Sequence, residues 1–281
     1  MPDLKWRLSE VIISPTTHHE VKKMAIRPSD IRPLELASNS FVVVRESWVQ
    51  ILFAGGIFVL LSQLIVFFTK SSGIPAMVEM GNFAGSFTML LATVAVSLVT
   101  CARVLGVQIP YLPSALINDR YFWKYVWAAL VCGFLSVLAA LACVLVASFV
   151  VPLSAGLDFY SVPFLFTAGF AAVAWFVVYV RLFMVMPAVA VGEKVSLSAS
   201  LRRTRGIGLK VALSVVIALG GFIVAEYLLK GAATYGGDPA SSAIMSSLAV
   251  VLKLVRCAVE GALAGFIFVK VKENEPAQAE A

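Results

Sequence analysis

Charged residues are scarce in this chain. Of its 281 residues, 14% are charged, whereas an ordinary soluble domain has about 25%. Hydrophobic residues make up 60% of the sequence, and they fall in blocks long enough to cross about 30 Å of hydrocarbon. This composition excludes an ordinary water-soluble protein and predicts a protein of the lipid bilayer.

Residues that usually carry catalysis or bind metal are also few. The two histidines, His18 and His19, lie in the polar N-terminal stretch, and no aspartate falls inside an apolar block. A metal hydrolase or an intramembrane protease needs such groups to converge on one water molecule. The sequence also has no Walker A loop, GxSxG nucleophile elbow or dinucleotide-binding fingerprint. We therefore expect a non-catalytic protein without a metal or cofactor.

Cysteine occurs four times, with no CxxC spacing. The four residues all lie inside apolar blocks: Cys101, Cys132, Cys143 and Cys257. We expect them to be small buried hydrophobic side chains that form no disulfide.

Six apolar stretches are each long enough to span a bilayer. They cover residues 48–69, 83–105, 125–151, 162–187, 208–230 and 243–270. The predicted fold class is therefore all-α, a polytopic protein with six transmembrane helices. The domain organisation that follows is a polar N-terminal segment over 1–32, a transmembrane domain over 33–272 and a tail over 273–281.

The basic residues set the expected orientation of these spans. Lys and Arg concentrate in the N-terminal segment, the second and fourth connections and the tail, whereas the other three connections contain only Lys70 and Lys230. By the positive-inside rule, both termini and the even-numbered connections face the cytoplasm. This distribution accounts for the net charge of +6, so we expect no nucleic-acid partner.

A weak repeat precedes the first, third and fifth spans, where short amphipathic segments begin at Pro33, Pro113 and Ser196. In the first segment, five apolar residues recur at helical spacing: Leu34, Ala37, Phe41, Val44 and Trp48. This spacing predicts a short helix in the cytoplasmic interface. We predict three parallel units, each an interfacial helix and a transmembrane hairpin, around a pseudo-threefold axis. The alternative is that any cytoplasmic loop that leads into a membrane has this pattern.

Two GxxxG pairs, Gly81 with Gly85 and Gly261 with Gly265, predict close approach of helices. We expect this packing within the chain, with a homodimer seam as the alternative.

The sixth span contains three charged residues, Lys253, Arg256 and Glu260, which lie within about 60° of one another around a helix. Thirteen Leu, Ile, Val and Phe residues between 244 and 269 favour insertion by about 4 to 8 kcal/mol, whereas three central charges oppose it by about 7 to 10 kcal/mol. The charges must therefore face the bundle interior, a water-filled cavity or a partner. Glu226 is the candidate partner of Lys253, and Arg181 that of Glu260, while Arg256 and Glu260 are also spaced to pair with each other.

Two interpretations of this intramembrane polar site remain open, and a further alternative is that Lys253 snorkels outward to the interface. The site could bind a lipid headgroup, an anion or a proton, or it could be an ion network that only fixes helix packing.

Four basic residues crowd the fourth connection: Arg202, Arg203, Arg205 and Lys210. Each such charge near an anionic leaflet contributes about 1 kcal/mol to membrane binding. We expect contact with anionic lipid headgroups, and ordinary positive-inside topology is the alternative.

The run RLFMVMPAVAVGEKVSLSASLRRTRG over 181–206 resembles the signature of the membrane domain associated with bacterial glycerophosphoryl diester phosphodiesterases, and of related six-helix inner-membrane proteins of unknown role. The matching positions are Arg181, Pro187, Ala188, Gly192, Glu193, Ala199, Leu201, Arg202, Arg203, Thr204, Arg205 and Gly206. The resemblance implies six helices in a bacterial inner membrane, with both termini cytoplasmic. In that family the phosphodiesterase chemistry belongs to a separate barrel domain, for which the six spans leave no room here. It also implies that Pro187 ends or kinks the fourth span and that Glu193 holds the basic helix by its N-terminus.

These observations favour a non-catalytic membrane protein that handles or transports a lipid, an amphiphile or an anion. The alternative is an assembly or regulatory subunit that docks a cytoplasmic protein partner through residues 1–47 and the Arg202 region. An enzyme that acts on lipid headgroups is less favoured.

Overall fold

The computed structural model describes residues 32–150, 162–193, 197–204, 207–235 and 239–279. This part of the chain is helical and contains no β-strand. Six of its helices are long and apolar enough to cross a membrane. The predicted all-α, six-span organisation is therefore confirmed, whereas nearly all of the N-terminal segment lies outside the described residues.

The helices divide into long membrane-spanning helices and short connecting helices. The long ones are α4 (Trp48–Ser71), α5 (Pro75–Leu105), α7 (Arg120–Val150), α8 (Val162–Leu182), α11 (Gly208–Tyr235) and α12 (Pro239–Ala279). The short ones are α3 (Pro33–Glu46), α6 (Pro113–Ile117), α9 (Val185–Ala190) and α10 (Leu197–Arg203).

Local sequence signals set several helix ends. Pro33, Pro75 and Pro113 stand in the first turns of α3, α5 and α6, where a missing backbone N–H costs nothing. Gly106 ends α5 in the left-handed conformation with φ of 69°, which glycine adopts without steric cost. The Asp119 carboxylate accepts a hydrogen bond of 2.7 Å from the backbone N–H of Tyr121 and so caps the start of α7.

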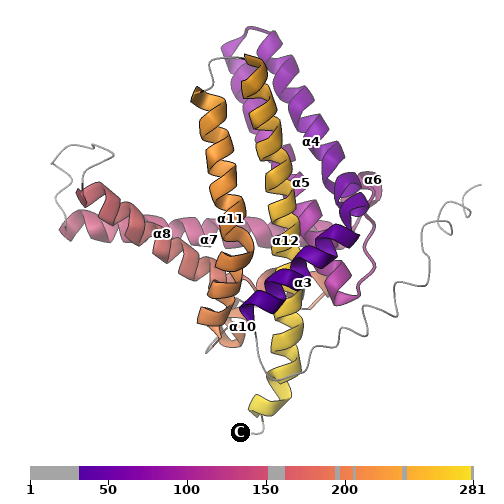
Figure 1. The fold of residues 1–281 in the computed structure, drawn as a ribbon, viewed down its shortest axis with the longest axis vertical. Helices are drawn as coiled ribbons and strands as arrows, with labels where there is room; N and C mark the ends of the chain where they lie inside the picture. Colours follow the sequence, from indigo (N-terminus) through magenta and orange to yellow (C-terminus); the bar gives the residue numbers. More distant parts are fainter. Residues whose placement is uncertain (1–31, 151–161, 194–196, 205–206, 236–238, 280–281) are drawn as a thin grey trace, which may run out of the picture. The chain divides into compact units, whose positions relative to one another are not determined.

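Four long helices form two hairpins that pack side by side (Figure 1). α4 pairs with α5 and α11 with α12, and the contact between α5 and α12 joins the two hairpins. A Cβ on Gly261 would lie 2.2 Å from the Ser97 carbonyl oxygen, and one on Gly81 would lie 1.9 Å from Thr69 Oγ1. The predicted intramolecular packing of the GxxxG pairs is therefore confirmed.

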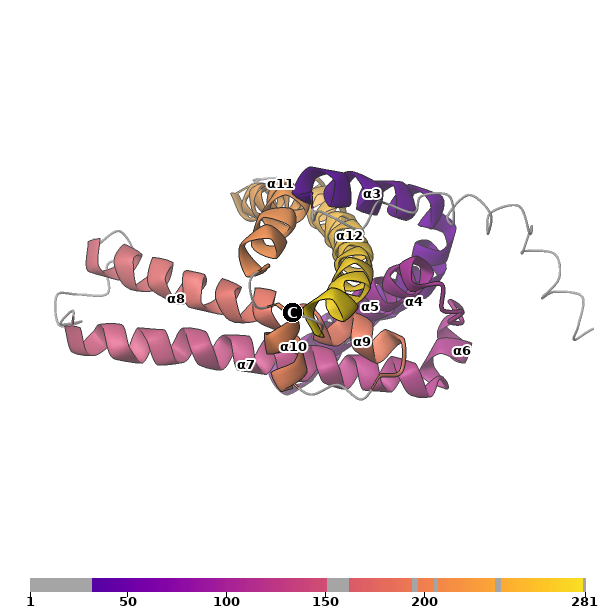
Figure 2. The same cartoon turned by 90° about the horizontal axis from the view of Figure 1, so that it is seen from below.

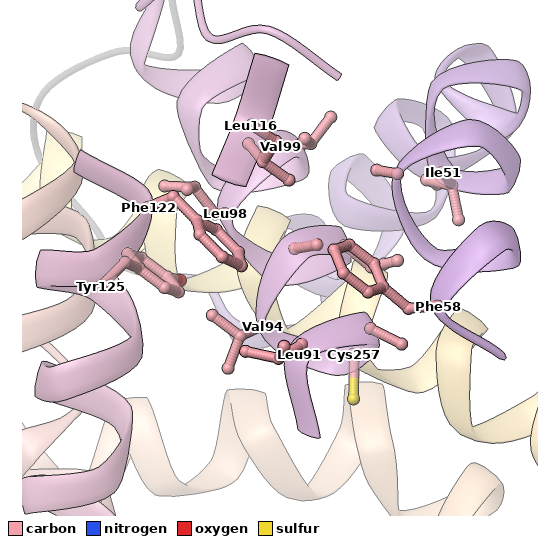
Figure 3. Close-up of a cluster of buried hydrophobic side chains, with 14 of the residues drawn as sticks. Ile51, Phe58, Leu91, Val94, Leu98, Val99, Leu116, Phe122, Tyr125 and Cys257 are labelled. Atoms are coloured by element: carbon pink, nitrogen blue, oxygen red, sulfur yellow. The ribbon is translucent and has the colours of Figure 1, made fainter. Parts of the chain in front are cut away.

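Buried side chains of α4, α5, α7 and α12 form one core cluster (Figure 3). Phe58 and Phe122 stack with ring centroids 6.5 Å apart, and Leu98 and Tyr125 are fully buried in the same cluster. Cys257 also belongs to it, and all four cysteines are free thiols. Cys101 and Cys257 are buried as expected, whereas Cys132 and Cys143 are only partly buried.

Helix α3 lies across α11 and α12. Its buried residues are Leu36, Ala37 and Ser40, whereas Leu34, Phe41 and Trp48 of the apolar face expected in the membrane interface are exposed. The helix is present as the spacing predicts, and its position in the membrane interface stays a prediction.

The α7–α8 hairpin runs crosswise to the other four long helices in both views (Figures 1 and 2). It meets them at its base, where α7 contacts α5 and α9, and α8 contacts α10 and α11. Three hairpins, preceded by α3, α6 and α10, are thus present as predicted, but the threefold packing is not observed. Glycines of α12 allow it to pack closely against α5. On α7, a Cβ on Gly133 would meet nothing within 4 Å, so this glycine makes no close contact with another helix.

The fourth predicted span is broken. α8 ends at Leu182 and α9 begins at Val185, two residues before Pro187. Pro187 has no N–H to donate to the carbonyl of Phe183, four residues earlier, and its ring clashes with that carbonyl. The break at this point agrees with the expectation from the resemblance.

Candidate functional site

The predicted polar stripe occupies one face of α12. Other faces of the helix are apolar: Ala258 packs in the core with α5, and Val259 and Leu263 pack in a second core with α3 and α11. Lys253 and Arg256 remain partly exposed. The stripe is therefore the face of α12 that the two hairpins leave open.

Glu226 of α11 lies at the end of this stripe nearer the α11–α12 connection, which we call its outer end. Its side chain is only 8% exposed and forms an ion pair of 3.3 Å with Arg256 and another of 2.7 Å with Lys230. We had predicted Lys253 as its partner, and that pairing is wrong. Arg256 is the stripe residue that reaches Glu226, and Lys230 follows Glu226 by one helical turn.

Several polar atoms at this end of the stripe are not fully used. Glu226 Oε2 and Arg256 Nε are buried without a hydrogen bond among the described residues. The Lys253 ammonium has no ion pair or hydrogen bond within the same part of the chain. The outer end of the stripe thus has one buried carboxylate shared by two cations, and a third cation, Lys253, one helical turn from Arg256 without a described partner.

The inner end of the stripe is organised by hydroxyl groups. The Tyr179 hydroxyl of α8 donates a hydrogen bond to Glu260 Oε1, and Ser97 of α5 and Tyr125 of α7 share a hydrogen bond of 3.0 Å. Trp175 stacks on Tyr179 with ring centroids 5.3 Å apart. These contacts fasten the base of the α7–α8 hairpin to α5 and α12.

Sequence reasoning missed these hydroxyl partners. Tyrosine and serine inside apolar spans are common, so Tyr179, Tyr125 and Ser97 did not stand out. They could have been predicted only from the requirement that a carboxylate inside the membrane, such as Glu260, has a hydrogen-bond donor at the same depth in the bilayer. Arg256 acts on Glu260 electrostatically across one helical turn but forms its ion pair with Glu226.

Arg181 does not pair with Glu260, contrary to our prediction. Its guanidinium donates a hydrogen bond of 3.1 Å to the Thr204 carbonyl oxygen, and its own carbonyl oxygen accepts one of 2.7 Å from Ser200. Arg181 thus connects the C-terminal end of α8 to α10. It follows Tyr179 along α8, and Tyr179 is the residue that binds Glu260.

A second charged cluster lies at the inner end of α12. The Glu193 carboxylate contacts Arg203 at 3.1 Å and also binds Lys272. Both cations lie over the Phe268 ring, Arg203 at 5.4 Å and Lys272 at 5.7 Å from its centroid. Partial burial raises the pKa of Glu193, but the hydrogen bonds and charges of Lys272 and Arg203 outweigh it, so the pKa lies below its ordinary value.

Glu193 contacts the basic helix at its C-terminal residue, Arg203. The contact with the helix N-terminus that the resemblance implies falls on residues 194–196, which lie outside the described residues. Of the other predicted headgroup contacts, Arg202 and Lys210 are exposed. Arg205 lies outside the described residues.

Among the described residues, no group of three or more His, Cys, Asp and Glu side chains is placed to hold a metal ion. Comparison with known proteins adds no relative: no family model, no curated protein and no solved structure matches the chain. The resemblance of residues 181–206 to the phosphodiesterase-associated membrane domain stays a prediction.

Proposed function

We propose that this integral membrane protein is non-catalytic and binds the anionic headgroup of a lipid or other amphiphile at the outer end of the α12 stripe. The observation that carries this proposal is the charge imbalance there. Glu226 is shared by Arg256 and Lys230, and Lys253 has no acceptor among the described residues.

The cost of intramembrane charge favours an anionic ligand. Each Lys or Arg at the centre of a span costs about 2.5 to 3.5 kcal/mol, and one carboxylate compensates only part of that cost. A phosphate or carboxylate between Lys253 and Arg256 would form charge-assisted hydrogen bonds with both cations. The partial exposure of both side chains leaves them accessible from the bilayer side.

The basic rim, formed by Arg202 and Lys210 at the expected cytoplasmic end of the spans, would attract anionic lipid headgroups more weakly. The exposed side chains of Arg202 and Lys210 carry charge of the sign that anionic leaflets attract. With the positive-inside rule and the resemblance of residues 181–206, this supports a bacterial inner membrane with cytoplasmic termini.

Native mass spectrometry of the protein in mild detergent, with added phosphatidylglycerol or inorganic phosphate, tests the proposal. Lys253→Met is the decisive variant because Lys253 holds no described partner, so its removal leaves the Glu226 pairs intact. We expect it to weaken the anionic adduct at least tenfold. Lys70→Met, which removes one lysine at the exposed end of α4, is the matched control and should bind as wild type does.

The two added compounds distinguish the source of the anion. Retention of phosphatidylglycerol alone indicates an amphiphile, and retention of phosphate alone indicates a free anion. Equal binding by wild type and Lys253→Met, or a wild type free of any adduct, contradicts the proposal. The latter result would favour a subunit that docks a protein partner.

A further inference from the structure

The outer part of the α7–α8 hairpin has no partner in the described chain except itself. Only 6% of the most apolar stretch of α7 is buried, against 61% for α5. Trp127, Phe134 and Leu141 are exposed along α7, as are Phe166 and Phe170 along α8. The exposed side of each helix in this part of the hairpin is therefore apolar, with no polar face.

A crosswise hairpin of this kind does not suit the membrane interface. Helices that lie in the interface plane need a charged or polar face, which α7 lacks. α7 has 31 residues and α8 has 21, so they are about 46 Å and 31 Å long, enough to cross the hydrocarbon. The physical chemistry of the hairpin therefore favours an orientation along the other spans.

The base of the hairpin lies on the stripe face of α12. Tyr179 binds Glu260, one helical turn inward of Arg256. A rotation of the hairpin about this contact and the Tyr125–Ser97 contact would lay α8 along α12. Both helices approach the Tyr179–Glu260 pair from their N-terminal sides, so they would then run parallel.

In that arrangement the two helices have matching registers. Four residues before the pair, Trp175 would face Arg256, and seven residues before it, Ala172 would face Lys253. Tryptophan is the best ring for stacking with a guanidinium, and alanine leaves space for a lysine side chain. Trp175 and Ala172 are both exposed. Trp175 stacks on Tyr179 through one face of its ring, and the other face is available for Arg256.

We propose that the α7–α8 hairpin swings about its base and closes over the Lys253–Arg256 end of the stripe, with Trp175 stacked on Arg256. The hairpin would thus control access to the headgroup site, a role that rests on the proposed function of that site. The swing itself requires only the register match.

Disulfide trapping in membranes tests the closed arrangement. In the crosswise arrangement Ala172 and Lys253 each lie about 10 Å from the Tyr179–Glu260 contact along helices that diverge, too far for the Cα limit of about 7 Å. The double variant Ala172→Cys/Lys253→Cys should therefore form a disulfide only if the hairpin closes. Under mild oxidation we expect at least fivefold more cross-linked protein than in either single variant, which also controls for the native cysteines.

Val173→Cys/Lys253→Cys is the matched control. Val173 is also exposed but points about 100° away around α8, so this pair should stay at the single-variant level. Trp175→Leu in the Ala172→Cys/Lys253→Cys background should lower the yield several-fold. Absence of the disulfide in a folded double variant, or equal yields for both pairs, overturns the proposal.

Failure of the hairpin proposal and failure of the binding proposal give different results. If the cross-link forms but wild type carries no anionic adduct, the hairpin closes but does not control access to a ligand. If Lys253→Met loses the adduct but no cross-link forms in the double variant, the headgroup site is supported and the hairpin movement is contradicted.

Discussion

Gly261 makes the closest glycine contact between α12 and α5. A Cβ at Gly261 would lie 2.2 Å from the Ser97 carbonyl oxygen and 2.5 Å from Thr100 Oγ1. The first contact is with backbone, which can yield only if the helices separate. We expect Gly261→Ala to lower the free energy of unfolding by about 1 to 3 kcal/mol, measured as the denaturation midpoint in detergent.

Gly133→Ala is the control for this prediction. Gly133 lies on α7, and a Cβ there would meet nothing within 4 Å. Alanine in a helix is favoured over glycine by about 0.5 to 1 kcal/mol, so this variant should be as stable as wild type or slightly more so. Equal midpoints for Gly261→Ala and wild type would contradict the close-packing argument.

The sequence predicted the residues of the stripe but not their partners. Spacing alone puts Lys253, Arg256 and Glu260 on one face of a helix. The pairing of Arg256 with Glu226, and of Glu260 with Tyr179, depends on side-chain length and on the relative heights of three helices. The sequence pattern of one helix does not determine its position along the helix axis relative to the other two.

At the scale of elements, the connection between α9 and α10 is held to α12 through Glu193. Because Lys272 and Arg203 keep the pKa of this carboxyl below its ordinary value, Glu193 contributes stability above the unfolded pKa of about 4.3. That contribution is lost as the pH falls through the lowered pKa. We expect the unfolding midpoint of wild type to fall toward that of Glu193→Gln below pH of about 4.

A pH series from neutral to acidic, recorded on both proteins, measures this difference. Other carboxylates titrate in both, so only the difference between the two midpoints reports on Glu193. A difference that stays constant with pH would show that the negative charge of Glu193 adds no stability.

Element boundaries could be predicted from the sequence where local chemistry decides them. Pro33 and Pro113 begin helices close to where the amphipathic segments were expected. The second helix begins at Pro75 and not at 83, because hydropathy locates the hydrocarbon-crossing part and a helix can continue beyond it. The gap between α8 and α9 was expected from the resemblance, as an end or a kink of the fourth span at Pro187.

At the scale of the whole molecule, the three hairpins were predictable and their packing was not. Inside a bilayer an apolar helix surface gains little by leaving lipid for another apolar helix. Packing therefore depends on close-fitting residues such as Gly261 and on polar pairs such as Tyr179–Glu260. The six apolar runs are nearly alike in hydropathy, so they contain little information about which hairpins adjoin.

The orientation of the molecule decides which leaflet meets the basic rim, and it can be measured with two cysteine variants. Ser71 is exposed at the end of α4 and Arg202 is exposed on α10, at opposite ends of the spans. The positive-inside rule places Arg202 in the cytoplasm. A membrane-impermeant maleimide should therefore label Ser71→Cys in intact cells and Arg202→Cys only after permeabilisation, with wild type as the background for the native cysteines. The reverse pattern would place Arg202 and Lys210 against the outer leaflet, where they could not bind the anionic cytoplasmic leaflet. The charges of the α12 stripe lie within the span, so their role in the proposed function would not change.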